Sequence, residues 1–279
     1  MHSRKITEQM IGQFYECLKR EEKSRATIEK YIRDVRAFYI YAGENVVKKE
    51  LVQRWKQKLL DSGYAVRSIN SMLASLNSLF YFLGWEDCRV KNLKMQRQTY
   101  CPEEKELTKS EYLRLLKAAD HKPQLRLIME TLCSTGIRVS ELHSFTVEAV
   151  KKGRVEISCK GKIRTILLPG KLKKYLIDYA KKHQIRTGMI FLTKQGTPLH
   201  RSSIWAQMKK LCKKAKVRAD KVFPHNLRKL FARVFYAQEK DIAKLADVLG
   251  HSSINTTRIY IMTTGAEHLR QLNQMGLVV

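Results

Sequence analysis

The chain has 279 residues, 44% of them hydrophobic and 29% charged, which is typical of one large or two ordinary globular domains and excludes an intrinsically disordered protein. Its apolar runs are too short to cross a bilayer and no secretory signal follows Met1, so we expect a soluble cytoplasmic protein. The formal net charge of +28 at pH 7 predicts a polyanionic partner, and nucleic acid is favoured over an anionic membrane surface because no single helix combines the charge with an exposed apolar face.

The first part of the chain has the apolar periodicity of four amphipathic helices. Apolar side chains recur every three or four residues over 11–18, 28–39, 52–59 and 69–83. The predicted helix ends lie at Gly43, Gly63 and Gly84. We therefore expect a small helical bundle over residues 1–95, in which the aromatic stripes form the core and are not base-stacking platforms.

A polar stretch over 96–106, with Pro102 and little apolar periodicity, predicts a linker between two domains. The second domain, over 107–279, opens with a capping box at 108–111, in which Thr108 and Glu111 satisfy free backbone donors of a new helix. Another helix is expected from about 124 to 134.

Two strands are predicted at 154–158 and 164–168, joined by a basic hairpin turn at Lys160-Gly161-Lys162, with a further short strand at 189–192. The fold class is accordingly mainly α with a small antiparallel β-sheet. A helical-bundle N-terminal domain precedes an α+β domain that ends in a C-terminal helix.

A lysine-rich helix is predicted over 202–216, with Trp205, Met208, Cys212 and Ala215 on one face. Five lysines with no interleaved acid occupy much of the remaining surface, and two interpretations stay open: contact with a phosphate backbone, or a solvated face. These lysines are Lys209, Lys210, Lys213, Lys214 and Lys216.

Three motifs of the basic second domain together offer the parts of a phosphodiester-cleaving site that needs no metal. They are Thr135-Gly136-Ile137-Arg138, Pro224-His225-Asn226-Leu227-Arg228, and the stretch from His251 to Tyr260. Guanidinium groups can fork onto two phosphate oxygens and neutralise the charge that develops there. Histidine and lysine can move protons, and a tyrosine nucleophile preserves the bond energy as a phosphotyrosine ester.

The order and spacing of these motifs resemble the tyrosine recombinase (lambda-integrase-like) family. The resemblance is strong over 108–260 and looser over the helical N-terminal region, which is similar to the family's core-binding domain. It implies a core-binding domain at 1–95 and a catalytic domain at 107–279. The helical bundle starts almost at Met1, which leaves no room for a separate arm-binding domain and points to a compact Xer-like form.

The resemblance also implies roles for individual residues. Arg138 would hold the scissile phosphate, with Glu141 as an acidic supporting residue. Lys160 would be the general acid for the 5′ oxygen, with Lys162, two residues away, as the alternative.

In the second motif, the resemblance makes Arg228 the other phosphate clamp and His225 an acid/base or phosphate-contacting group, which share a face of one helix. Lys229 follows Arg228 where many members have histidine, a departure that leaves the motif itself intact. His251, after a helix that ends at Gly250, would hydrogen-bond the phosphate, and Tyr260, on a short following helix, would attack it.

The function implied is a site-specific recombinase that cleaves and rejoins DNA through a 3′-phosphotyrosyl intermediate, for integration, excision, inversion or dimer resolution, in the bacterial cytoplasm or nucleoid. No cofactor and no metal are expected. The partner is double-stranded DNA with paired sites, bound by a tetramer that is a monomer or weak oligomer when free. A helix after Gly265 would pack on a neighbouring subunit or on its own domain. The alternatives are a type IB topoisomerase and a catalytically silent DNA-binding regulator.

Overall fold

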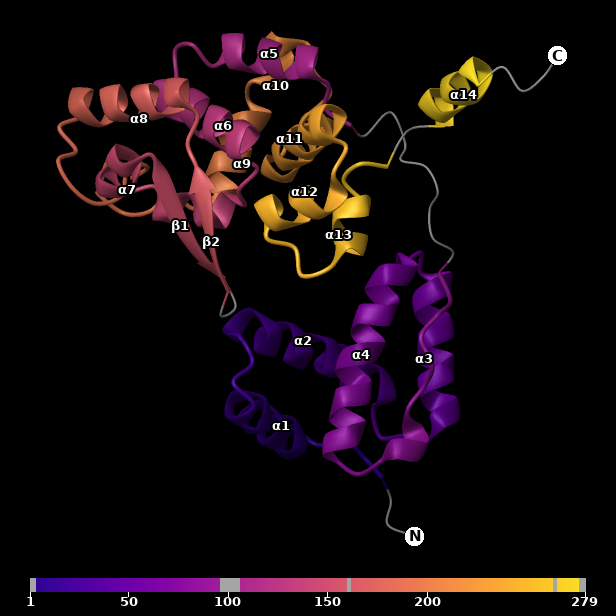
Figure 1. Ribbon diagram of the computed structural model, residues 1–279. Coiled ribbons are helices and arrows are strands. Elements are labelled where there is room, and N and C mark those ends of the chain that lie inside the picture. The colour runs from indigo at the N-terminus through magenta and orange to yellow at the C-terminus, as the bar shows by residue number, and fades with distance from the viewer. Residues whose placement is uncertain (1–3, 96–105, 160–161, 263–264, 276–279) are drawn as a thin grey trace. The chain divides into compact units, whose positions relative to one another are not determined.

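The computed structural model describes residues 4–95, 106–159, 162–262 and 265–275. The chain divides into two compact units, Met1–Arg97 and Gln98–Val279 (Figure 1). Most of the linker predicted at 96–106 lies outside the described residues. Within the described parts of the chain, no helix is long and apolar enough to span a membrane.

The first unit contains the four predicted helices. They are α1 (Glu8–Arg20), α2 (Arg25–Ala42), α3 (Lys49–Asp61) and α4 (Val66–Phe82), followed by the 3-10 turn η1 (Glu86–Cys88). Helix α2 packs against α4, and Thr7 and Ser24 cap the amino ends of α1 and α2 by accepting backbone hydrogen bonds.

Aromatic side chains form the centre of this first unit, as predicted. Phe38 is fully buried, and its ring lies edge-on to Trp55 and Phe80, with centroid distances of 5.1 Å and 6.1 Å. Such edge-to-face contacts add to the free energy gained by burying the rings. These three rings are therefore core residues and are not available to stack on bases.

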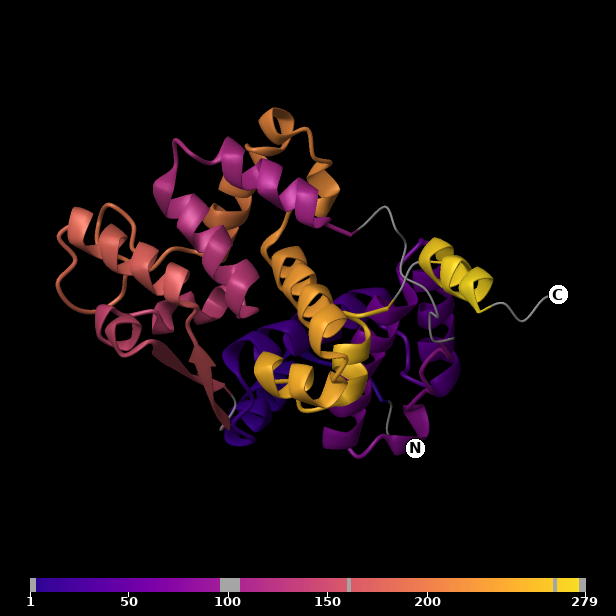
Figure 2. The ribbon, with the colours of Figure 1, turned by 45° about the horizontal axis from the view of Figure 1, so that its top comes forward.

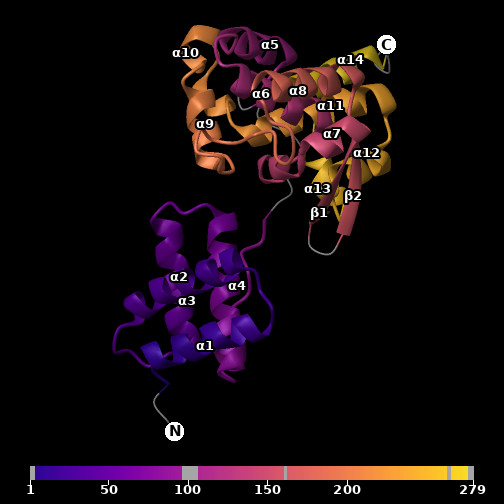
Figure 3. The same cartoon turned by 90° about the vertical axis from the view of Figure 1, so that its left-hand side faces the viewer.

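The described residues of the second unit are mostly helical, with one two-stranded sheet (Figures 1 and 3). Its elements, in chain order, are α5 (Lys109–Ala118), α6 (Pro123–Thr135), η3 (Val139–Ser144), α7 (Val147–Lys152), β1 (Arg154–Cys159), β2 (Lys162–Leu167), α8 (Gly170–Lys182), α9 (Arg201–Lys209), α10 (Cys212–Ala215), η4 (Ala219–Lys221), α11 (Pro224–Glu239), α12 (Ile242–Leu249), α13 (Ile254–Arg258) and α14 (Gly265–Gln274). The capping box predicted at Thr108 and Glu111 is present at the start of α5. The fold class is thus the predicted one, mainly α with a small antiparallel sheet.

Strands β1 and β2 pair antiparallel, with Arg154 opposite Leu167 and Ile157 opposite Arg164. Alternate residues of a strand point to opposite faces, so the inner face of β2 contains Arg164 and Ile166, whereas Leu167 is exposed. Strand β2 begins earlier than predicted, because residue 162 is already paired. Residues 160–161 of the predicted turn lie outside the described residues.

Two predicted elements were wrong. Residues 189–192 form no strand and make only single bridges, Met189 with Thr146 and Leu192 with Pro198, because their apolar side chains enter the core of helices instead of joining a sheet. The predicted lysine-rich helix over 202–216 is broken between α9 and α10 and ends at Lys216, whose φ of 51° is left-handed. Trp205, predicted on its buried face, is 47% exposed.

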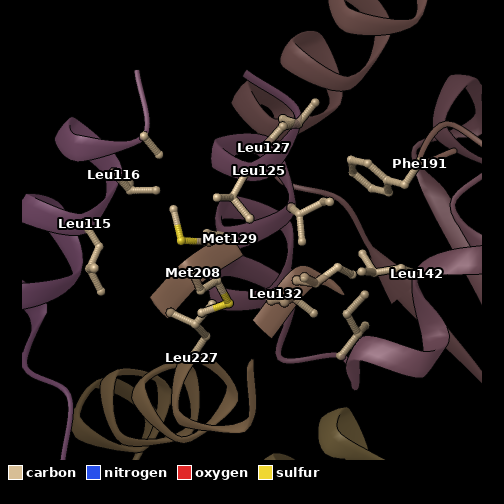
Figure 4. Close-up of a cluster of buried hydrophobic side chains, with 14 of the residues drawn as sticks. Leu115, Leu116, Leu125, Leu127, Met129, Leu132, Leu142, Phe191, Met208 and Leu227 are labelled. Carbon is tan, nitrogen blue, oxygen red and sulfur yellow. The ribbon is translucent and has the colours of Figure 1, made fainter. Parts of the chain in front are cut away.

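The main core of the second unit surrounds α6. Figure 4 shows Met129 and Leu132 of α6 beside Met208 of α9, with Leu227 of α11 close by. A separate small cluster joins α11, α12 and the segment that follows α13, and it consists of Ala232, Leu245, Leu249 and Tyr260. Figure 2 shows α11 running towards α12 and α13. The core therefore fixes α6 against α11, and the small cluster fixes α12 and Tyr260 against the far part of α11.

Gly136 ends α6 with a φ of 63°, a left-handed conformation that favours glycine. A Cβ at this position would collide with the ring of Phe231 and lie 3.1 Å from Leu249. We expect Gly136→Ala to lower the free energy of unfolding by about 2–4 kcal/mol, the sum of backbone strain and overpacking. Urea denaturation of the variant measures this loss.

Gly170→Ala is the matched control in the same unit, because Gly170 has no positive φ and nothing lies within 4 Å of the place that an added methyl group would occupy there. Its unfolding free energy should stay within about 1 kcal/mol of the unchanged protein. Equal stability of the two variants would show that Gly136 is not required by the backbone.

Candidate active site

Arg138 is positioned by the end of α6. The chain leaves the helix through Gly136, turns extended at Arg138 and enters η3, where Glu141 is 5% exposed. The Glu141 carboxylate accepts hydrogen bonds from the Arg138 backbone N–H at 2.7 Å and from its Nη1 at 3.0 Å. Glu141 therefore fixes both the backbone and the side chain of Arg138.

Arg164, which the motifs did not identify, also reaches this carboxylate. Its Nη2 donates to Glu141 Oε2 at 2.7 Å, and its Nη1 donates to the backbone oxygen of Leu249 at the end of α12. The signal that could have revealed it is strand alternation: Arg164 lies two residues before the buried Ile166, and so on the inner face.

Arg228 is the most buried charged side chain of the site, with 1% of its surface exposed. Its Nη1 donates to the backbone oxygen of Gly136, and its Nη2 donates to that of Leu249 at 2.7 Å and to His251 Nε2 at 2.9 Å. Burial, with the nearby charge of Arg138, lowers the pKa of Arg228 to about 10. The folded chain thus keeps a poorly compensated cation in the site.

His251 follows Gly250, which ends α12 with a φ of 64° as predicted. Because Arg228 can only donate, Nε2 of His251 accepts that hydrogen bond, and Nδ1 carries the proton and donates to Thr257 Oγ1 at 2.9 Å. Thr257 is fully buried, and the motifs gave no reason to select it. It orients the imidazole.

Tyr260 lies two residues beyond the end of α13, in a turn, and not on that helix as predicted. Its side chain is 8% exposed, and the centre of its ring is 5.0 Å from that of His251 and 5.2 Å from that of His225. The guanidinium carbon of Arg228 is 6.0 Å from the ring centre. The structure therefore brings the tyrosine to both histidines and the buried arginine.

Both histidines are surrounded by positive charge. Burial and the charge of Arg228 lower the pKa of His251 to about 4, with smaller effects of Arg138 and Arg164. His225 is more exposed, yet loss of water on its packed side and the charge of Lys229 also lower its pKa. Near pH 7, His251 is therefore neutral and can accept a hydrogen bond.

The lowered pKa of His251 should make the free energy of unfolding depend on pH. Since the folded pKa, about 4, lies below the unfolded value near 6.5, the unfolded chain binds more protons between these values. The contribution of His251 to the free energy of unfolding is then fully present above about pH 6.5 and is lost as the pH falls towards 4. We expect His251→Gln to lose less stability over this window than the unchanged protein.

Thermal melts of the two proteins, from about pH 7 down to about pH 5, measure the difference. His225 titrates in both proteins, so the difference isolates His251. Melting temperatures that fall in parallel would contradict a neutral His251 in the folded chain.

One of the lysines predicted from the sequence lies outside the described residues. Lys160 lies outside the described residues, and Lys162 is described only as the first residue of β2. Among the lysines of α9 and α10, Lys209 donates a hydrogen bond to the backbone oxygen of Ala219. The remaining four lysines are exposed, and they are Lys210, Lys213, Lys214 and Lys216.

The arginine cluster is defined as Arg138, Arg164 and Arg228, and the Glu141 carboxylate forms ion pairs with the first two of these residues. Together, the three arginines and Glu141 have a formal charge of +2. In the described residues, no group of three or more His, Cys, Asp or Glu side chains could bind a metal ion. The cluster is thus suited to bind an anion that approaches Tyr260.

Two family models match the chain. The model described as "Phage integrase family" matches residues 105–267, and that described as "Phage integrase, N-terminal SAM-like domain" matches residues 11–87. The first match contains all the site residues named above, and the second corresponds to the helices of the first unit.

Curated relatives match over nearly the full chain. "Tyrosine recombinase XerA" of Pyrococcus furiosus is 30% identical over 97% of this chain and 95% of its own length, and "Tyrosine recombinase XerD" of Staphylococcus haemolyticus is 28% identical over 90% and 92%. Among solved structures, a lambda integrase(75-356) dimer bound to a COC′ core site covers 93% of this chain and 96% of its own, with a TM-score of 0.76 at 20% identity. XerH bound to difH substrate covers 93% and 82%, with a TM-score of 0.71 at 18% identity.

Proposed function

Because this chain belongs to the phage integrase family, the tyrosine recombinases, whose members cleave and rejoin DNA, we propose that Tyr260 is its nucleophile and that Arg138 and Arg228 bind the scissile phosphate. The observation that carries this proposal is the convergence of the Tyr260 ring on Arg228, His225 and His251. The named relatives and structures are recombinases and integrases, and they give no support to the type IB topoisomerase alternative.

In the proposed reaction, the Tyr260 oxygen forms a bond to phosphorus as its proton leaves, and the bond from phosphorus to the 5′ oxygen breaks. His225 is available to accept the proton, because its lowered pKa leaves it neutral. Lys160 gives a proton to the departing 5′ oxygen. The products are a 3′-phosphotyrosyl ester and a free 5′ hydroxyl, so that attack by a 5′ hydroxyl reverses the reaction and rejoins a strand.

The charge of the site favours the transition state over the bound substrate. A phosphodiester carries one negative charge, and attack by a tyrosine oxygen that has lost its proton raises this to about two in the pentacoordinate state. The arginine cluster with Glu141 supplies a matching formal charge of +2. The buried Nε of Arg228, for which no hydrogen-bond partner is present among the described residues, is one donor available to a phosphate oxygen.

DNA is the proposed partner, because the similar solved structures include recombinases bound to their DNA sites. We assign DNA contacts to residues 1–95 and to the exposed lysines of α9 and α10, and we place the enzyme with genomic DNA in the cytoplasm or nucleoid. Exchange of strands requires two sites, and a lambda integrase has been solved as a tetramer on a Holliday junction. A tetramer on paired sites is therefore proposed here, in which α14, with Leu269 and Leu272 exposed, packs on a neighbouring copy.

The test is covalent trapping on a nicked duplex. A pool of duplexes with randomised sequence around a nick would be incubated with the protein, and DNA that stays attached to it after denaturation would be sequenced. A nick close to the cleaved bond releases the short 5′-hydroxyl strand, so rejoining fails and the adduct accumulates. Recovery of one recurrent sequence supports a site-specific recombinase, and no adduct at all would overturn the proposal.

A further inference from the structure

Arg164 connects two parts of the site that the motifs treat separately. Its side chain is only 15% exposed, and its guanidinium group donates to the carboxylate of Glu141 at 2.7 Å and to the backbone oxygen of Leu249. Glu141 in turn fixes Arg138, and Leu249 lies two residues before His251. One planar group thus contacts the segment of the first arginine and the segment of the second histidine.

The Glu141 and Leu249 acceptors of Arg164 are each shared with another arginine of the cluster. The Glu141 carboxylate also binds Arg138, and the Leu249 oxygen also accepts from Arg228 Nη2 at 2.7 Å. This oxygen is at the carboxyl end of α12, where backbone carbonyls lack helical partners and the helix dipole is negative. Arg164 therefore competes for the same negative groups, which leaves more of the positive charge of Arg138 and Arg228 uncompensated.

The surrounding backbone is shaped to admit Arg164. A Cβ at Gly250 would collide with its guanidinium group, so Gly250 is needed both for its positive φ and for this contact. Strand pairing of Arg164 with Ile157 fixes where the side chain enters the site. Arg164 is also on the strand that follows Lys160, the proposed general acid.

We propose that Arg164 is a positioning residue for DNA cleavage: it sets strand β2, the Arg138–Glu141 pair and the Leu249–His251 segment in one geometry. This inference rests on the proposed function, since it concerns the same site. Arg164 does not itself touch the phosphate. Its loss misplaces the residues that do, and displacements of about 1 Å in an active site can lower a rate by about 100-fold.

The experiment uses the full chain and the nicked duplex recovered by trapping. Arg164→Met removes the charge and the hydrogen bonds to Glu141 and Leu249, whereas Arg164→Lys keeps the charge but lacks the planar guanidinium fork that contacts these two acceptors. The matched control is Arg154→Met, because Arg154 is exposed on β1 of the same hairpin. For each protein, single-turnover cleavage, the dissociation constant for DNA at one salt concentration and the melting temperature are measured.

We expect cleavage by Arg164→Met to be about 100-fold slower than by Arg154→Met, and cleavage by Arg164→Lys about 10-fold slower, with DNA affinity changed less than about threefold. The pH profile of cleavage separates the effect of the Arg164 charge from the effect of its hydrogen-bond geometry. Protonation of His251 removes the acceptor of its hydrogen bond with Arg228. Without the positive charge of Arg164 the pKa of His251 rises, so the acid limb of the cleavage profile should move to higher pH in Arg164→Met and stay in place in Arg164→Lys.

Three results would overturn this inference. One is cleavage by both Arg164 variants at the rate of Arg154→Met. The second is a loss of DNA affinity as large as the loss of cleavage, which would make Arg164 a DNA contact. The third applies if Arg164→Met does not fold: cleavage by a folded Arg164→Lys at the full rate. If the unchanged protein forms no adduct, it is instead the proposed function that fails.

Discussion

Tyr260→Phe is expected to abolish the covalent adduct with DNA while DNA binding is retained. The substitution removes only the hydroxyl that attacks phosphorus, and the ring keeps its place in the small cluster with Ala232, Leu245 and Leu249. Loss of a nucleophile lowers turnover by about 10⁴-fold or more, which takes adduct formation below detection. Denaturing electrophoresis of labelled nicked duplex measures the adduct, and a gel shift measures binding.

Tyr236→Phe provides the matched control, because Tyr236 is a partly buried residue of α11 that packs on the same cluster. It should form the adduct at the normal rate. An adduct of normal yield with Tyr260→Phe would show that another residue is the nucleophile. Binding of DNA without an adduct by the unchanged protein would favour the catalytically silent regulator instead.

Arg228→Met is expected to lower single-turnover cleavage by about 10³-fold, the effect of removing a preorganised donor to the developing charge. The same substitution should change the free energy of unfolding much less than it changes the free energy of activation for cleavage. The lowered pKa of Arg228 shows that the fold disfavours this buried charge, so its removal offsets part of the loss of hydrogen bonds to Gly136, Leu249 and His251. We expect the free energy of unfolding to change by no more than about 2 kcal/mol.

Urea denaturation and single-turnover cleavage of the same preparation test this separation of function from stability. Arg228→Lys extends the test: its ammonium keeps the charge but cannot fork onto three acceptors and a phosphate, and it should also cleave slowly. Cleavage by Arg228→Met near the normal rate would contradict the role of a phosphate clamp. A loss of cooperative unfolding would make Arg228 a structural residue.

Periodicity predicted most of the helices because an amphipathic helix records its buried face directly in the sequence. Periodicity failed for short segments, whose burial depends on packing against distant parts of the chain. Residues 189–192 are apolar because Ile190 and Phe191 fill the helical core, and strand pairing is not involved. The break between α9 and α10 follows no glycine or proline, so it depends on packing that a single helix pattern does not contain.

The site was predicted in part for a similar reason. Arg138, His225, Arg228, His251 and Tyr260 lie in compact motifs whose order can be read from the chain, and the structure brings them together. Arg164 and Thr257 act through contacts with Glu141, Leu249 and His251, which are distant in sequence or unmarked by residue type. Such supporting residues become visible only when the chain is folded.

In the proposed reaction, Tyr260 forms a bond to the 3′ phosphate of a cleaved strand. The most direct measurement is mass spectrometry of the trapped adduct after digestion with trypsin and nuclease, combined with end-labelling of the released DNA. We predict a phosphate, with any remaining nucleotide, on Tyr260 in the peptide 259–270, and a released strand with a free 5′ hydroxyl. A modification on any other residue, or a 5′ end blocked by protein, would contradict attack by Tyr260 on the 3′ phosphate.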